Sequence, residues 1–123
     1  MRALWPRIKP GLEAVHAKTV PDWIPEDIYT CLRAGTAILL LADEADWFIV
    51  VQHQGRIYGS CLLIWILHAP GDYAEFADKV YSELERLARE LKATRLEMHS
   101  PRRGWERDPH WIRRETIYTR EVL

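Results

Sequence analysis

The sequence predicts an α+β domain with a mostly antiparallel sheet, one long central helix and short flanking helices. The long helix is the clearest element, because apolar residues recur at helical spacing between Phe76 and Leu91 while charged residues fill the other positions. The apolar runs Tyr58–Leu67 and Leu96–Met98 predict a strand on either side of this helix. A strand, a helix and a second strand in this order form a right-handed unit with parallel strands.

Length and composition fit one folded domain that spans residues 1–123. Hydrophobic residues make up 48% of the chain and charged residues 28%, as in ordinary globular proteins. The net charge of -1 gives no general electrostatic reason to bind nucleic acid or an anionic membrane. The arginines near the C-terminus are more simply interpreted as a solvated charged face. They are Arg102, Arg103, Arg107, Arg113 and Arg114.

The cysteines and apolar runs predict a reduced, cytoplasmic protein. Cys31 and Cys61 are far apart in the sequence, and neither belongs to a CxxC motif. The longest uninterrupted apolar run, Cys61–Leu67, is too short to cross a bilayer, and we see no signal peptide. The histidines are scattered without ligand spacing, so we expect no metal site.

Two helices are expected before the first strand. Pro10-Gly11 precedes a short helix that ends near Lys18, and its start is not defined by the sequence. Pro25, followed by two acidic residues, is typical of the first turn of a helix. Gly35 is a suitable C-terminal stop for this second helix.

Three antiparallel strands then form a meander. The runs Thr36–Ala42, Trp47–Gln52 and Arg56–Leu67 are apolar, and a polar break at Asp43–Asp46 separates the first two. Gln54-Gly55 predicts a tight turn between the second and third strands.

The long helix is expected to span Tyr73 to Lys92. Asp72 and Glu75 stand three residues apart, as in a capping box, so the helix begins near Tyr73. Later elements are a strand through Met98, a short helical turn within Trp105–Trp111 and a final strand, Glu115–Val122.

This order of elements resembles the GNAT superfamily of acyl-CoA-dependent N-acyltransferases over nearly the whole chain. The segment from Phe76 to Met98 is similar to the family's central helix and following strand. The compact form also resembles small phage-encoded members. The resemblance implies acetyl-CoA or another acyl-CoA as cofactor and an amine as acceptor.

The family's cofactor motif is only partly matched. Members usually carry Arg or Gln, two residues, Gly, one residue, and then Gly or Ala, and the matching positions here are Asp72, Glu75 and Ala77. Only Ala77 fits. If both acids cap the helix, they occupy the amides that pyrophosphate would use, so we expect a weakened CoA site unless Gly71 marks a shifted motif. The resemblance places cofactor binding at Leu67, His68, Ala69, Gly71, Tyr73, Ala74 and Ala77.

Catalytic groups are less evident. The family often uses an acid on the central strands as general base, but no Asp or Glu lies between Tyr58 and Leu67. The position of the family's tyrosine acid reads Trp105-Glu106-Arg107. His68 is therefore the catalytic candidate, because its pKa range suits proton transfer, although a lone histidine is more often structural.

Two functions remain open. The first is acyl transfer from acyl-CoA to an amine of an unidentified acceptor, with weak or lost CoA binding as one form of it. The second is a non-catalytic GNAT-like protein-interaction module, phage-encoded or virion-associated, with the segment Arg102–Trp111 as its binding surface. A homo-oligomer is compatible with both, while membrane and nucleic acid are not expected as partners.

Overall fold

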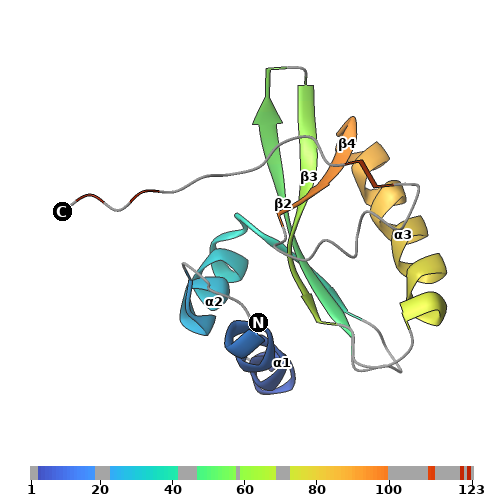
Figure 1. The fold of residues 1–123 in the computed structure, drawn as a ribbon. Coiled ribbons are helices and arrows are strands. Elements are labelled where there is room, and N and C mark those ends of the chain that lie inside the picture. Colours follow the sequence, from blue (N-terminus) through green and yellow to red (C-terminus); the bar gives the residue numbers. More distant parts are fainter. Residues whose placement is uncertain are drawn as a thin grey trace.

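The structure, a computed structural model, describes residues 3–18, 23–41, 47–57, 59–68, 73–99, 111–112, 120 and 122, with the backbone alone for 73–78. Its elements in chain order are α1 (Trp5–Lys18), α2 (Pro25–Ala34), β1 (Ile38–Leu41), β2 (Phe48–Arg56), β3 (Gly59–His68), α3 (Tyr73–Glu90) and β4 (Arg95–Met98). The strands form one four-stranded sheet in the order β1-β2-β3-β4 (Figure 1).

The sheet topology agrees with the sequence prediction. The first three strands form an antiparallel meander, and β4 pairs with β3 in parallel after the α3 crossover. The predicted α+β class with a mostly antiparallel sheet and one long helix is therefore confirmed.

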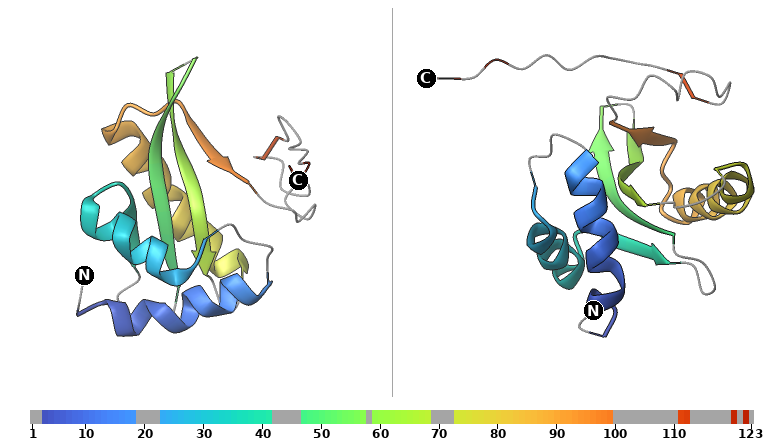
Figure 2. Two further views of the ribbon diagram at one scale, coloured as in Figure 1. Left: turned by 90° about the vertical axis from the view of Figure 1, so that its left-hand side faces the viewer. Right: turned by 60° about the horizontal axis from the view of Figure 1, so that its bottom comes forward.

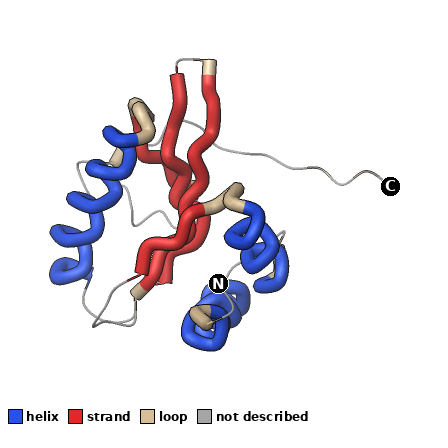
Figure 3. The backbone as a smooth tube through the Cα atoms, turned by 180° about the vertical axis from the view of Figure 1, so that it is seen from behind, coloured by secondary structure: helices blue, strands red, loops and turns tan. Residues whose placement is uncertain are grey.

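Both faces of the sheet are covered by helices. Helices α1 and α2 lie against one face, and α3 lies against the other (Figure 3). Strand β2 serves both cores because successive side chains point to opposite faces. Phe48 and Val50 pack under α1 and α2, whereas Ile49 and Val51 pack under α3.

Helix α2 is delimited by the signals that the sequence contains. Pro25 occupies the first turn, and the Asp27 Oδ2 atom accepts a hydrogen bond from the Ile24 amide at 3.0 Å. Gly35 ends the helix with a φ of 78°, a conformation that glycine adopts without steric cost.

Helix α1 begins earlier than Pro10-Gly11 predicted. It starts at Trp5 and contains Pro10 in its interior, at the loss of one backbone hydrogen bond. The side chains of Ile8 and Leu12, one turn apart on the sheet side, are fully buried. Their burial offsets the weak helix propensity of this segment.

The turn between β2 and β3 also differs from the prediction at Gln54-Gly55. Strand β2 continues to Arg56, which faces Gly59, so the connection between the strands lies between these two residues. Gly55 is an ordinary strand residue opposite Ser60. Gly59 has a φ of 140°, so the glycine that this turn requires is the one after it.

Helix α3 starts at Tyr73 as predicted but ends at Glu90 rather than Lys92. Leu91 and Lys92 form a turn, and Lys92 takes a positive φ of 58°. The Ala93 amide donates to the Ala88 carbonyl at 2.8 Å, which closes the last turn of the helix.

The remaining sequence predictions concern a shorter strand and several segments that the structure does not describe. Strand β1 is four residues long, shorter than the predicted Thr36–Ala42. The Asp72 and Glu75 capping box, the Trp105 segment and the Glu115–Val122 strand lie outside the described residues or side chains. Among the described helices, none has both the length and the apolar character needed to cross a membrane.

The buried stripe of α3 gives a direct test of this packing. Leu84 is 0% exposed between α3 and the sheet, so Leu84→Ala should lower the free energy of unfolding by about 2–5 kcal/mol. Chemical denaturation measures the change, and Glu85→Ala on the exposed face is the control. Equal stability of the two variants would contradict this packing.

Candidate active site

Strand β3 contains one extra residue near its carboxyl end. Val51 faces Ile64 and Val50 faces Ile66, so Trp65 is inserted between two consecutive partners on β2. Such a bulge bends the strand and increases its twist.

The parallel pairing of β3 with β4 ends beside this bulge. The last described pair is Ile64 with Met98, whereas β3 continues to His68. All four residues of β4 pair with β3, and Figure 2 (left) shows β4 at the edge of the sheet. The last four residues of β3 thus extend past the described β4 pairing, just before the start of α3 at Tyr73.

The bulge also changes which side chains face each helix layer. Leu62 and Ile64 pack under α3, but the next residue on that side is Leu67. Trp65 and Ile66 both contact the core under α1 and α2.

His68 lies at the predicted strand end, on the side of α1. Its ring is tilted by 37° against the Phe48 ring, with the centroids 5.2 Å apart. A Cβ atom on Gly11 of α1 would lie 2.8 Å from the His68 Cδ2 atom and 2.5 Å from the Phe48 Cε1 atom. His68 is therefore a half-buried packing residue in this structure, and its catalytic role stays a prediction.

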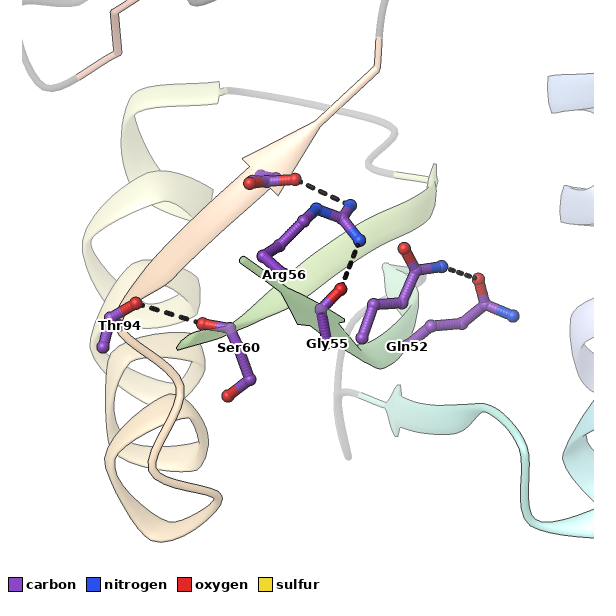
Figure 4. A network of polar contacts seen from close by, with 7 residues as sticks. Gln52, Gly55, Arg56, Ser60 and Thr94 are labelled. Carbon is purple, nitrogen blue, oxygen red and sulfur yellow. Dashed lines mark hydrogen bonds and ion pairs between the residues drawn. The ribbon is translucent and has the colours of Figure 1, made fainter. Parts of the chain in front are cut away.

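A carboxylate lies next to the last described pair of β3 and β4. Glu97 on β4 faces Leu63 and precedes the last pair by one residue. Its Oε2 atom lies 2.9 Å from the Arg56 Nη2 atom of β2, and the Glu97 side chain is 22% exposed. The other amino group of Arg56 donates to the Gly55 carbonyl at 3.0 Å (Figure 4).

The thiol of Cys61 belongs to the same group. Burial raises the pKa of this thiol, and its hydrogen bond to Glu97 raises the pKa further. Cys61 thus remains a neutral donor at physiological pH and helps to fix the Glu97 carboxylate.

The other candidates are described in part. Leu67 packs on the α3 side of the sheet. Tyr73, Ala74 and Ala77 belong to the first turns of α3, where only the backbone is described. Ala69 and Gly71 lie outside the described residues. In the described part of the chain, no three His, Cys, Asp or Glu side chains gather as metal ligands.

The tryptophans have mainly packing roles. Trp23 is only 9% exposed within the core under α1 and α2. The Trp111 Nε1 atom donates to the Tyr81 Oη atom at 3.3 Å, so this residue contacts α3. Trp105 lies outside the described residues.

Glu97 is a candidate site residue that the sequence interpretation missed. The sequence has no acid between Tyr58 and Leu67, whereas Glu97 lies on the next strand, β4. The alternation in β4 contains the signal, because Leu96 and Met98 pack under α3 and therefore direct Glu97 to the opposite face.

Comparison with solved structures shows the same fold in acetyltransferases. A probable acetyltransferase has a TM-score of 0.70 at 14% identity, with 98% of this chain and 91% of that chain covered. A ribosomal-protein-alanine N-acetyltransferase from Brucella melitensis biovar Abortus 2308 has a TM-score of 0.65 at 16% identity, with 98% and 93% covered. The chain has a GNAT-like fold.

The sequence comparisons gave no further assignment. No family model matches the sequence, and no curated protein matches it. The GNAT-like fold therefore rests on the solved structures and on the topology described above.

The contact between α1 and the end of β3 can be tested at Gly11. Alanine is ordinarily favoured over glycine in a helix by about 1 kcal/mol. Gly11→Ala should nevertheless reduce thermal stability, because its methyl group would overlap the Phe48 and His68 rings. Gly55→Ala is the control, since no neighbouring atom lies within 4 Å of the added carbon. Higher stability of Gly11→Ala would show that α1 does not approach the strand so closely.

Proposed function

We propose that this protein is an N-acyltransferase that transfers an acyl group from acyl-CoA to an amine. The observation that carries the proposal is the bulged end of β3, which continues past the described β4 pairing at the start of α3. The GNAT-like fold of the solved acetyltransferases supports it.

The backbone of β3 fits one part of the proposed cofactor. Pantetheine is an extended chain with two amide groups, and a strand edge offers amides and carbonyls at matching intervals. Trp65–Leu67 would hold this arm, and Leu67 lies on the side of α3. Acyl-CoA supplies an activated thioester when it is bound.

Glu97 is our candidate for the general base. An ammonium group must lose a proton before its nitrogen can attack a thioester, and a carboxylate accepts that proton directly or through one water. Arg56 and Cys61 hold the Glu97 carboxylate at the sheet face opposite α3. An acceptor amine approaching this face would thus meet the base beside the last described pair of β3 and β4.

The start of α3 has one feature that favours binding of acyl-CoA and one that opposes it. Free amides in the first turn of a helix attract a diphosphate. The sequence has two acids there, Asp72 and Glu75, which we expect to cap the helix. Their charge and their competition for the amide donors should weaken the binding of acyl-CoA.

Removing the proposed base should affect acetyl transfer but not the binding of acetyl-CoA. Glu97→Gln should lower acetyl transfer by about 10²–10⁴-fold while leaving the acetyl-CoA dissociation constant unchanged. The assay uses labelled acetyl-CoA with a mixture of peptides bearing a free N-terminal amine, lysine and spermidine. Glu85→Gln, an exposed change on α3, is the control. Undiminished transfer by Glu97→Gln would exclude this role.

Charge reversal at the helix start tests the cofactor site. The unmodified protein should bind acetyl-CoA with a dissociation constant at or above about 1 mM, and Asp72→Arg with Glu75→Gly should tighten binding about tenfold. Calorimetry measures both. Glu13→Arg with Glu85→Gln carries the same charge change on exposed positions and should leave affinity unchanged. Micromolar binding by the unmodified protein would contradict the weakened site.

The second candidate is a non-catalytic GNAT-like interaction module. The acids at positions 72 and 75 favour it, because they replace residues that the family uses for pyrophosphate. Absence of acetyl-CoA binding by both forms would favour this module over the enzyme. The enzyme would act in the cytoplasm, whereas a phage-encoded module would act there or in the virion, and either form could be a homo-oligomer.

A further inference from the structure

A second candidate site lies on the surface of the two N-terminal helices. A pocket of about 190 Å³ is lined by Trp5 and Pro6 of α1 and by Glu26 and Tyr29 of α2. None of these residues belongs to the bulged end of β3 or to the Glu97 group.

Two aromatic rings form walls of this pocket. The Trp5 and Tyr29 ring centroids are 4.9 Å apart and their planes meet at 67°, so the rings stand edge to face. Both residues are half-buried, and Trp5 packs against the core that contains Ile8 and Leu12. The rings are thus held in place and partly shielded from water before any ligand binds.

A carboxylate completes the pocket. Glu26 lies in the first turn of α2 next to Asp27, whose carboxylate is engaged in capping the helix. The Glu26 carboxylate is exposed and forms no ion pair with any residue in the described part of the chain. Its charge is therefore available to a ligand.

We propose that this pocket binds an organic cation of the methylated ammonium class. Aromatic faces carry negative electrostatic potential and attract cations, most strongly when water is excluded. A carboxylate adds attraction for the same charge and repels anions. Methylated ammonium groups are preferred over free ammonium because their weaker hydration makes contact with the rings less costly.

Two kinds of ligand carry the group that this pocket would bind. A free quaternary amine and a trimethylated lysine in a peptide both carry the trimethylammonium group. Since the pocket is open to solvent and lies on the surface of α1 and α2, either form can reach it.

The experiment compares a cation with its neutral isostere on the full chain. Choline and 3,3-dimethyl-1-butanol have nearly the same shape and differ in charge. Addition of choline should shift the Trp5 indole and Glu26 amide NMR signals in a saturable way, with the alcohol at least about tenfold weaker. Equal binding of the two compounds would overturn the proposal.

Variants test the contribution of the carboxylate. Glu26→Gln should weaken choline binding by at least about threefold, whereas Glu13→Gln on the exposed side of α1 should leave it unchanged. Unaltered choline binding by Glu26→Gln would contradict the proposed site. A peptide with trimethyllysine that binds more tightly than choline identifies a protein ligand, and the reverse order identifies a free amine.

Discussion

The structure depends on a sheet whose central strands must be apolar on both faces. Strands β2 and β3 contribute alternate residues to two separate cores, one under α1 and α2 and one under α3. Among the described residues, ten of the fully buried side chains belong to these two cores, so neither helix layer can be removed without exposing apolar surface. The alternation also fixes register, because a shift by one residue would exchange the two faces.

The single extra residue, Trp65, is accommodated in β3 although the strand contributes side chains to both cores. It reverses the alternation at the end of β3 without disturbing the rest of the strand, and both cores remain filled on either side of it. The strand bends at the same position, and the described pairing with β4 ends there. The feature on which the proposed cofactor site depends is therefore a local departure from an otherwise regular sheet.

The sequence predicted the elements whose signals are local. The periodic stripe of α3 and the Pro25 and Gly35 boundaries of α2 depend on neighbouring residues and were confirmed. The prediction of a turn at Gln54-Gly55 was wrong because the sequence has two glycines nearby, Gly55 and Gly59. Only the strand pairing and the backbone show that Gly59 takes the positive φ. The interior position of Pro10 in α1 likewise depends on tertiary burial of Ile8 and Leu12.

The candidate site was harder to predict than the fold. His68 was selected by its place at a strand end, but its ring packs against Phe48 near Gly11, which no local pattern reveals. Glu97 depends on a partner 41 residues away in the sequence, Arg56, so its position became evident only from the parallel pairing of β3 with β4. Functional groups assembled from distant strands require the topology before they can be recognised.

The return connection from β3 to β4 imposes a length on α3. The Ser60 carbonyl accepts hydrogen bonds from the Thr94 amide at 2.9 Å and from the Thr94 hydroxyl at 3.1 Å, which anchors the start of β4 beside the start of β3 (Figure 4). The 18 residues of α3 span about 27 Å, close to the roughly 33 Å of the ten-residue β3. A single inserted residue would rotate the following part of the helix by about 100° and turn its apolar stripe away from the sheet. Relatives of this chain should therefore vary the crossover by whole helical turns, together with the length of β3.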